Sequence, residues 1–413
     1  MMLLQKKIKA TAIEVRSLDP RDLRPPLPAT GNKQALKLAI ITNHPPPFRI
    51  PVFERIAATP GIELLVIFCS RREPNRQWKV PPLTFNHLFL KERFVTRGDN
   101  FIHNNPDVLP ALVKFGPDAV VTTGFNPTFL YAFAYCLASG VKHIPMTDGT
   151  EVSEQALSRW HKTLRRFIYS RSGSFIAASA GGERLYQSYG VEAERCFKSC
   201  LCIDNTSYLE ADPESRAFDF IFCGRIVPGK NPLFALDVAA EAARRLQRRV
   251  SILFVGSGSQ EEAVRRAAEQ HAGLVDAHFN GFASQDELPG LYRSAKVFLF
   301  PTLADVWGVV ANEACAAGLP IIVSPHAGTA GELILDQQNG FICDLDVGAW
   351  SERAVQLLTD DDLWQGFSER SREIVSGYSF DHAAAGVVAA ATQAVRHPRK
   401  ARARIVASKA GLS

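Results

Sequence analysis

Short apolar runs of strand length recur from residue 37 onward, and each is followed by a segment long enough for a helix. In the first half of the chain these runs are "LKLAIITN", "IELLVIFCS", "DAVVTTG", "KHIPMTD" and "SFIAASA". They are rich in β-branched and other apolar residues, and several end in Gly, Ser, Thr or Asp. Buried parallel strands have this pattern because helices cover both faces of their sheet. The first half therefore predicts an α/β fold with a parallel sheet.

The rhythm breaks at the polar segment "IDNTSYLEADPESRAF" (203–218), which contains Pro213 and fits a linker. It then resumes with the runs "FDFIFCG", "RVSILFVG", "AHFNG", "AKVFLFP", "PIIVS" and "NGFICD". Helical stretches such as "NPLFALDVAAEAARRL" lie between them. The sequence thus predicts two doubly wound, Rossmann-like domains, with ligands expected where the carboxyl ends of the strands of the two domains face each other.

Domain boundaries follow from these breaks. Residues 1–35 lack periodicity and contain "DPRDLRPPLPATGN", which indicates a disordered leader. We expect an N-terminal domain at 36–204, a linker at 205–217, a C-terminal domain at 218–380, and a cross-over helix with a basic tail at 381–413. The last helical stretch, roughly 361–396, is expected to cross back and hold the two halves together.

Composition limits the class of protein. The chain has 413 residues, 46% of them hydrophobic, which is enough for two cores. No apolar run reaches the roughly 20 residues of a membrane span, and the first residues lack the apolar run of a signal peptide. The crowded cysteines Cys196, Cys200 and Cys202 do not have the spacing of zinc pairs. We interpret them as reduced thiols of a cytoplasmic protein, with a metal site as the weaker alternative.

Positive charge is concentrated at the two ends of the chain. The net charge of +5 combines +4 in residues 1–35 and +6 in residues 396–413 with a body that carries the remaining −5. A basic tail usually remains in solvent, and less often binds an anionic partner. The sequence contains no nucleic-acid-binding motif. An anionic membrane surface is therefore the favoured partner of these ends, on the inner face of the membrane.

The loops after the predicted strands of the second half carry unusual residues. In "RIVPGKNP", Arg225 and Lys230 bracket a Pro-Gly turn that leads into a helix. Two cations beside a helix N-terminus suit a diphosphate, although two solvated surface charges are an equal alternative. In "SGSQEE", Gly256 and Gly258 form only G-x-G, and a plain turn is the better interpretation of this loop alone.

Two carboxylates stand out in "FPTLADVWGVVANEACAAG" (300–318). Asp305 precedes a predicted helix that begins at Gly308, and Glu313 lies inside that helix. A carboxylate can accept paired hydrogen bonds from vicinal hydroxyls. Asp305 can then hold a sugar and Glu313 a ribose, with a diphosphate on the helix N-terminus between them. The alternatives are a helix-capping aspartate and a buried, paired glutamate.

These motifs resemble the retaining GT-B glycosyltransferases of family four, the glycosyl transferases group 1. The resemblance is strong over 219–341, where "CGRIVPGKNP", "GSGS", "NGF", "DVWGVVANEACAAGLPIIVS" and "NGFICD" occur in the family's order. The family's Glu-x₇-Glu signature reads Asp305-x₇-Glu313 here, so the first acid departs from the commonest form. The stretch "TNHPPPFRIPVFERIA" (42–57) resembles the opening of some members but lacks the paired glycines that many relatives use near the donor phosphates.

The resemblance implies a role for each candidate residue. Arg225 and Lys230 would neutralise the diphosphate leaving group, and Glu313 would bind the ribose hydroxyls. Asp305 would hold the transferred sugar, beside donor-binding positions at Gly256, Gly258, Val306, Trp307, Gly308 and Val309. Relatives often place a histidine of the first domain beside the anomeric carbon. The matching loop "MTDGTE" has Asp148 in that place, and His103 is its rival.

No cofactor or metal is expected. The pair Asp344-x-Asp346 in "GFICDLDVG" has the spacing that GT-A enzymes use for a divalent cation, but it follows the last strand of the second half, away from the donor loops. Asp346 is expected to cap the next helix instead. The predicted cations and helix N-terminus would supply the electrostatic stabilisation that a metal gives elsewhere.

The predicted function is a metal-independent, retaining transfer of a hexosyl unit from a nucleoside-diphosphate sugar to a glycan or lipid-linked acceptor, in polysaccharide or glycoconjugate biosynthesis. One alternative is a sugar-nucleotide epimerase of the same architecture. Another is an inactive GT-B partner subunit, which would be expected to lose Arg225, Lys230 or Glu313, and all three are present.

The segment "EQALSRWHKTLRRFIYSR" (154–171) predicts an amphipathic helix. Its apolar face would contain Leu157, Trp160, Leu164, Phe167 and Ile168, and its flanks Arg159, Lys162, Arg165 and Arg166. Such a helix most often packs its apolar stripe on the sheet. The same pattern also suits a helix that lies on an anionic leaflet as a peripheral anchor.

Overall fold

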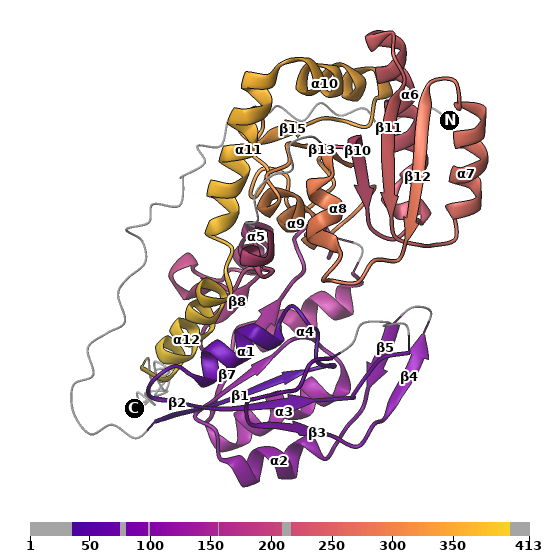
Figure 1. Ribbon diagram of the computed structural model, residues 1–413. Helices are drawn as coiled ribbons and strands as arrows, with labels where there is room; N and C mark the ends of the chain where they lie inside the picture. Colours follow the sequence, from indigo (N-terminus) through magenta and orange to yellow (C-terminus); the bar gives the residue numbers. More distant parts are fainter. Residues whose placement is uncertain (1–34, 75–79, 98–99, 156, 209–215, 397–413) are drawn as a thin grey trace, which may run out of the picture. The chain divides into compact units, whose positions relative to one another are not determined.

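The computed structural model describes residues 35–74, 80–97, 100–155, 157–208 and 216–396, and those from Leu36 onward belong to one compact unit (Figure 1). The predicted leader, apart from Ala35, and the predicted tail beyond Arg396 lie outside the described residues. The predicted linker begins with the 3-10 turn η3 (Asn205–Tyr208), and its residues 209–215 also lie outside. Among the described helices, none combines the length and apolarity that a bilayer-spanning segment requires.

The first sheet has seven parallel strands in the order β3-β2-β1-β6-β7-β8-β9. Its strands are β1 (Leu36–Thr42), β2 (Ile62–Phe68), β3 (His87–Phe89), β6 (Ala119–Thr122), β7 (Lys142–Thr147), β8 (Phe175–Ala177) and β9 (Cys196–Lys198). The accompanying helices are α1 (Ile50–Ala57), α2 (Val108–Phe115), α3 (Pro127–Ser139), α4 (Arg159–Tyr169) and α5 (Ala180–Ser188). The five strands predicted for the first half are confirmed.

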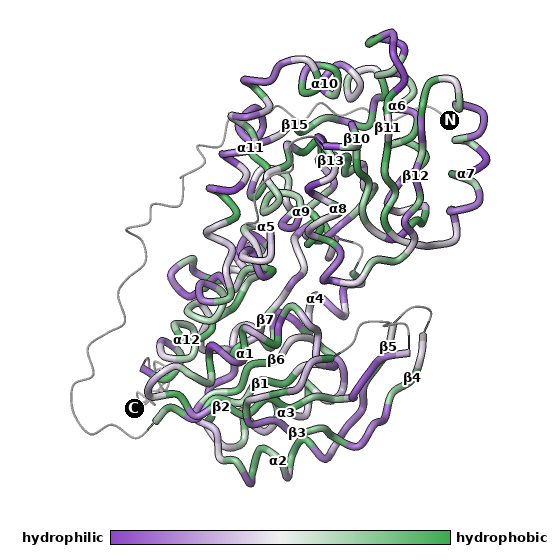
Figure 2. The backbone as a smooth tube through the Cα atoms, viewed as in Figure 1, coloured by the Kyte–Doolittle hydropathy of each residue, from purple (hydrophilic) through white to green (hydrophobic). Residues whose placement is uncertain are grey.

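Burial on both faces explains why these strands are continuously apolar. Successive side chains of a strand point to opposite faces. In β1, Leu38 and Ile40 belong to one buried cluster, which includes residues of α1, while Ala39 and Ile41 belong to another, which includes residues of α2 and α3. All four side chains are at most 1% exposed. The central strands are accordingly green in Figure 2, whereas the outward side of helix α7 is purple.

The second sheet has six parallel strands in the order β12-β11-β10-β13-β14-β15. Its strands are β10 (Phe218–Cys223), β11 (Val250–Val255), β12 (Val275–Gly281), β13 (Ala295–Phe300), β14 (Ile321–Val323) and β15 (Gly340–Ile342). Its helices are α6 (Pro232–Leu246), α7 (Glu261–Gln270), α8 (Leu288–Arg293), α9 (Val309–Ala316) and α10 (Val347–Thr359). All six predicted strands are confirmed, and both sheets follow the Rossmann-like order in which the first strand lies next to the fourth.

The predicted cross-over segment consists of two helices. α11 (Asp361–Ser376) packs on α9, and α12 (Phe380–Arg396) packs on α1 and on β7, β8 and β9 of the first sheet. The return to the first domain is therefore confirmed (Figure 1). Small residues on α12 permit a close approach to the sheet: a Cβ at Gly386 would lie 1.7 Å from the Lys198 carbonyl oxygen. Ser174 also donates a hydrogen bond to the Ala390 carbonyl at 2.7 Å.

Helix α4 is shorter than predicted, and its cations are not all at the surface. It begins after Ser158, whose hydroxyl accepts the His161 amide. Arg165 was expected on a solvated flank, but it is only 8% exposed. Its guanidinium lies 2.8 Å from the Glu154 carboxylate and 4.1 Å from the centre of the Phe125 ring. Pairing with an acid and a ring makes this burial possible, because both replace the solvation that the cation loses.

The predicted apolar face of α4 is also divided. Ile168 is buried, as the packing alternative requires, and so is its neighbour Tyr169, which was not assigned to this face. Trp160 and Phe167, however, are 74% and 46% exposed. The helix therefore packs one edge on the domain and presents two aromatic side chains to solvent.

Four strands of the first domain were not predicted. β4 (Phe94–Arg97) and β5 (Asn100–His103) form an antiparallel hairpin outside the main sheet, and β3 and β9 are edge strands of three residues each. Segments this short carry too few apolar positions to give a periodic signal.

The close contact at Gly386 generates a stability prediction. Gly386→Ala places a methyl group against the backbone of residue 198, so we expect a loss of roughly 1–3 kcal/mol in the free energy of unfolding. Gly366→Ala in α11 is the matched control, because no atom lies within 4 Å of its Cβ position. There the better helix propensity of Ala should stabilise by up to about 1 kcal/mol. Denaturant unfolding of both variants measures the difference, and equal stabilisation by both would contradict the packing of α12.

Candidate functional site

The predicted site residues of the second domain follow its two central strands. Arg225 lies just after β10, and Asp305 lies in the loop after β13. These strands are adjacent, and the order of the sheet reverses between them. This reversal is the point where doubly wound sheets bind ligands, because the loops on either side diverge and leave space above the strand ends.

An ion pair joins the loops after β10 and β13. The Lys230 ammonium, at the end of the 3-10 turn η4 (Pro228–Lys230), pairs with the Asp305 carboxylate, and both side chains are mostly buried. The Gly229 carbonyl also accepts hydrogen bonds from the Leu303 amide at 2.9 Å and the Thr302 hydroxyl at 3.1 Å. The structure thus brings the predicted phosphate-binding lysine and the predicted sugar-binding aspartate into direct contact.

Arg225 is exposed beside this pair. Among the described residues, its guanidinium forms no hydrogen bond or ion pair. Its loop is nevertheless fixed, because the neighbouring Ile226 donates its amide to the Ser257 carbonyl at 2.9 Å and accepts the Gln260 amide at 2.9 Å. The backbone around Arg225 is held while its cationic side chain remains in solvent.

The two glycines of the G-x-G loop are explained by this contact between loops. A Cβ at Gly256 would lie 2.0 Å from the Gly224 carbonyl oxygen, and one at Gly258 would lie 2.3 Å from the Ile226 carbonyl oxygen. Gly256 also has φ of 128°, a conformation that other residues rarely adopt. Both glycines therefore support the Arg225 loop, and their predicted contact with a ligand stays a prediction.

The start of α9 is shaped by its own glycine. Gly308 has φ of 92°, and a Cβ there would lie 2.4 Å from the Phe300 ring. Trp307 is buried and its indole donates to Asn312 at 2.8 Å, while Val306 is 42% exposed. The Trp307 amide points to the Asp305 carboxylate at 3.3 Å. One of the predicted backbone donors is thus engaged within the loop.

Glu313 is the buried acid of α9. It is 8% exposed, and its Oε2 accepts the hydroxyl hydrogen of Tyr292 at 2.8 Å. Burial raises the pKa of Glu313 to about 7, although the hydrogen bond from Tyr292 favours the charged form. The carboxyl group therefore changes its charge near neutral pH. Tyr292, on α8, was missed by sequence reasoning because nothing in "LPGLYR" distinguishes it from a core tyrosine.

In the first domain, Asp148 follows β7 directly and its side chain is 48% exposed. Its Oδ1 lies 2.8 Å from the Arg49 guanidinium. The rival candidate, His103, is fully buried, so it is unable to contact a substrate in this arrangement. Asp148 is the one of these two predicted residues that solvent reaches.

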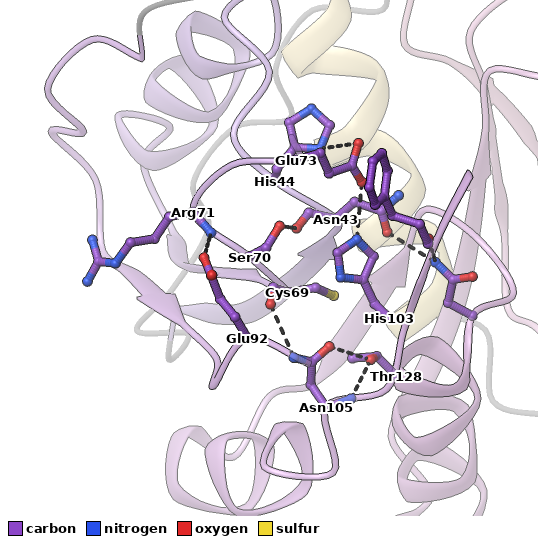
Figure 3. Close-up of polar contacts among 12 residues, drawn as sticks. Asn43, His44, Cys69, Ser70, Arg71, Glu73, Glu92, His103, Asn105 and Thr128 are labelled. Carbon is purple, nitrogen blue, oxygen red and sulfur yellow. Dashed lines mark hydrogen bonds and ion pairs between the residues drawn. The ribbon is translucent and has the colours of Figure 1, made fainter. Parts of the chain in front are cut away.

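His103 instead belongs to a buried charged cluster (Figure 3). Its Nε2 lies 3.1 Å from one oxygen of Glu73, and His44 Nδ1 lies 3.3 Å from the other. Burial opposes ionisation of Glu73, but the two histidines outweigh it and lower its pKa to about 2. The cluster joins the loops after β1 and β2 to the end of the β4-β5 hairpin.

A second set of polar contacts fixes the same region from below (Figure 3). Asn105 donates its side-chain amide to the Cys69 carbonyl at 3.1 Å and accepts the Thr128 hydroxyl hydrogen at 2.8 Å. The Arg71 amide donates to Glu92 at 2.7 Å. These bonds hold the carboxyl end of β2 and the start of α3 in one position.

The predicted cap of α10 is confirmed, because Asp346 accepts the Ala349 amide at 2.8 Å. All eight cysteines are unpaired, and their assignment to a cytoplasmic protein stays a prediction. A hollow of about 620 Å³ beside α8 is lined by Asn280, Glu287 and Arg293, among others, but by none of the predicted site residues. We place the candidate site at the loops after β10 and β13, because the charged groups converge there.

Comparisons with known proteins identify a family match in the second half of the chain and relatives that cover part of it. Residues 210–374 match the family model described as "Glycosyl transferases group 1". A D-inositol 3-phosphate glycosyltransferase of Salinispora arenicola is 28% identical over 189 residues, which are 44% of this chain and 42% of the relative. A GDP-mannose-dependent alpha-(1-6)-phosphatidylinositol monomannoside mannosyltransferase of Mycobacterium tuberculosis is 27% identical over 60% of this chain and 69% of its own. The chain thus spans less than half the length of the first of these relatives.

Solved structures share the fold. A glycosyltransferase of Rickettsia africae superposes with a TM-score of 0.67 over 89% of this chain and all of its own, at 14% identity. Anabaena Alr3699/HepE, solved with UDP and glucose, superposes with a TM-score of 0.63 over 86% of this chain and 99% of its own, at 14% identity. The chain therefore has the GT-B fold, and its residues 210–374 match the group 1 glycosyltransferase model, as the resemblance of its sequence motifs predicts.

Proposed function

We propose that the protein is a retaining glycosyltransferase that moves a hexosyl unit from a nucleoside-diphosphate sugar to a glycan or lipid-linked acceptor. The observation that carries this proposal is the Lys230–Asp305 ion pair beside the exposed Arg225, at the reversal point of the second sheet. The names of similar proteins support the donor class: the Anabaena structure holds UDP and glucose, and the Mycobacterium relative depends on GDP-mannose.

In this proposal the ion pair exchanges partners when the donor binds. A diphosphate competes with Asp305 for the Lys230 ammonium, because phosphate oxygens are strong acceptors of charge-assisted hydrogen bonds. Asp305 is then free to accept hydrogen bonds from hydroxyls of the transferred sugar. The two charges satisfy each other before the donor arrives, so neither remains as an uncompensated, mostly buried charge.

Departure of the diphosphate concentrates negative charge on its oxygens. Arg225, Lys230 and the amide groups at the start of α9 would stabilise that charge, and no metal is invoked for it. Contacts that strengthen as the charge develops accelerate the reaction, whereas contacts of equal strength in the ground state only improve binding. The backbone of the Arg225 loop is held before the donor arrives, so only the exposed side chain has to reorganise around the diphosphate.

Glu313 is proposed to bind the ribose. Tyr292 occupies Oε2, which leaves Oε1 for a ribose hydroxyl. The charged carboxylate is the better acceptor, and its pKa of about 7 lies far above the usual range of glutamate. Binding of the nucleotide would therefore favour the ionised form of Glu313.

The outer face of α4 is proposed to contact an anionic membrane surface. Trp160 and Phe167 project from it, and Arg159 and Arg166 are exposed on the same helix. Aromatic side chains flanked by cations are typical of helices that lie at a bilayer interface. A lipid-linked acceptor would be presented at that surface.

The leaving-group assignment predicts a loss of turnover. Arg225→Ala and Lys230→Ala each remove a charge-assisted contact worth roughly 1.5–3 kcal/mol, so kcat should fall about 10- to 100-fold. Nucleotide release from UDP- and GDP-sugars, in excess EDTA, measures it. Arg266→Ala is the control, since that arginine is 68% exposed on α7. Native turnover in both variants would reject the assignment, and interconversion of donors without transfer would indicate an epimerase.

Glu313 predicts a pH-dependent stability. In the folded protein its pKa of about 7 lies above the usual glutamate value of 4.5. The folded protein holds the Glu313 proton more tightly than the unfolded chain does, so this group's contribution to stability is fully present below pH 4.5. As the pH rises through 7 the contribution is lost, and the free energy of unfolding falls by about 3 kcal/mol. Glu313→Gln should lack this loss and be the more stable protein at pH 8. Denaturant unfolding at pH 5 and pH 8 tests it, and equal pH dependence in both proteins would contradict the burial argument.

The same Glu313→Gln variant tests ribose binding. Loss of the anionic acceptor should weaken nucleotide binding at pH 8 by about tenfold or more, measured by calorimetry with UDP and GDP. Unchanged affinity would assign Glu313 a structural role alone.

Membrane contact predicts binding that depends on salt and on α4. The native chain should sediment with phosphatidylserine vesicles at low salt, because each cation near an anionic surface contributes about 1 kcal/mol. Arg159→Glu with Arg166→Glu, or deletion of 397–413, should weaken it more than tenfold. Arg249→Glu with Arg266→Glu makes the same charge change on the second domain as a control. No sedimentation of the native chain at low salt would favour a soluble acceptor.

A further inference from the structure

We propose that Arg49 is a positioning residue for the transfer reaction, which acts by fixing the carboxylate of Asp148. The inference rests on the proposed function and on the expectation, drawn from the family resemblance, that Asp148 lies beside the anomeric carbon in that reaction. It adds a residue that sequence reasoning did not single out. Arg49 lies inside "PPPFRIPVFE" and has no motif of its own.

Arg49 joins three loops at the carboxyl edge of the first sheet. It is the residue immediately before α1, at the end of the loop that follows β1. Its Nη2 lies 2.8 Å from Asp148 Oδ1, in the loop after β7. Its Nη1 donates to the Ser199 carbonyl at 3.3 Å and lies 3.2 Å from the Ser199 hydroxyl, after β9. Each arm of the guanidinium is thus held by a different strand end.

The two partners differ in exposure. The Arg49 side chain is 6% exposed and the Asp148 side chain is 48% exposed. A guanidinium that is buried and bonded on both arms has one orientation, because its planar fork fits few geometries. Its half-exposed partner takes its orientation from it. An acid that contacts a ligand has to face solvent and keep one orientation. A buried, fixed cation gives Asp148 that orientation.

The carboxylate keeps one oxygen for such a ligand. Arg49 contacts Oδ1, and among the described residues Oδ2 accepts no hydrogen bond. An ionised carboxylate has about four lone-pair sites. Oδ2 is therefore available to a hydroxyl of the transferred sugar or of the acceptor, at an angle that the Arg49 contact sets.

The backbone that carries Asp148 is already fixed without Arg49. The Gly149 amide donates to the Thr147 hydroxyl at 3.0 Å, and the Thr150 amide to the Ser153 hydroxyl at 2.9 Å. A Cβ at Gly182 would lie 3.2 Å from the Gly149 carbonyl oxygen, so α5 packs closely under the same turn. The remaining freedom is rotation of the Asp148 side chain, and Arg49 removes it. Loss of the Arg49 contact should therefore change the orientation of the Asp148 side chain and leave the loop backbone in place.

A double-mutant cycle tests the inference. The variants are Arg49→Gln, Asp148→Asn and the double variant, assayed by nucleotide release from the UDP- and GDP-sugar panel. Misplacement of a reacting group by a fraction of a bond length already slows reactions by about tenfold or more. We expect each single variant to lower kcat by at least that factor, with little change in KM for the donor. The double variant should be no slower than Asp148→Asn, because Arg49 acts only through Asp148.

Two further variants control for structural damage. Arg49→Lys keeps the charge but lacks the fork that reaches two loops, so it should retain an intermediate kcat. Arg195→Gln removes another arginine of the first domain that bonds to the carbonyls of Ser172 and Gly173, and it should leave kcat unchanged. Unfolding by denaturant is measured for every variant. If Arg49→Gln does not fold, Arg49→Lys and Asp148→Asn complete the cycle.

The outcomes separate the inference from the proposed function. If the native chain releases nucleotide from no donor, the proposed function fails and the inference fails with it. If the native chain is active but the double variant loses the product of the two single-variant losses in kcat, Arg49 and Asp148 act independently. The inference is then overturned and the proposed function stands. Native kcat in Asp148→Asn overturns it as well. If the two substitutions are coupled in the free energy of unfolding but not in kcat, the Arg49–Asp148 pair only stabilises the contact between the loops and does not position a reacting group.

Discussion

Every strand in the two main sheets is parallel to its neighbours, and this constraint governs the rest of the molecule. A parallel strand is reached only by a crossover, so helices cover both faces and the strands must be apolar throughout. All the carboxyl ends of a sheet then lie at one edge. The polar chemistry of the chain is forced into the loops at that edge, where Arg49 and Asp148 meet in the first sheet and Lys230 and Asp305 in the second.

Charges at these edges are compensated in different ways. Asp305 and Asp148 each have a cation, and Glu73 has two histidines. Glu313 instead accepts a hydrogen bond from the neutral hydroxyl of Tyr292, and burial raises its pKa to about 7. Burial dominates where no cation is near. The segments at these edges therefore contain acids that pair with cations and one buried acid, Glu313, whose pKa lies near neutrality.

Sequence patterns were sufficient for the features that depend on local repetition. Eleven predicted strands and the cap at Asp346 follow from apolar runs and from short-range capping. Sequence patterns did not predict contacts between different loops. The burial of Arg165 depends on Phe125 and Glu154, and the burial of His103 depends on Glu73. A side chain's partners across the fold decide whether it is solvated, and spacing along the chain does not record them. The roles of Arg225, Lys230 and Glu313 for a ligand remain predictions for the same reason.

The first domain needs helix α12, which follows the second domain in the sequence, to complete its core. Alanines of α12 and its Val387 share one buried cluster with Leu38 and Ile40 of β1 and Ile50 of α1. More than 300 residues separate these partners along the sequence. While the chain emerges from the ribosome, the first sheet can pair its strands and cover the face under α2 and α3, but on the opposite face α1 leaves the surface that α12 covers exposed until α12 has been made. The first domain is thus completed only after the second has been synthesised, and chaperones that bind apolar surface have this face to protect in the interval.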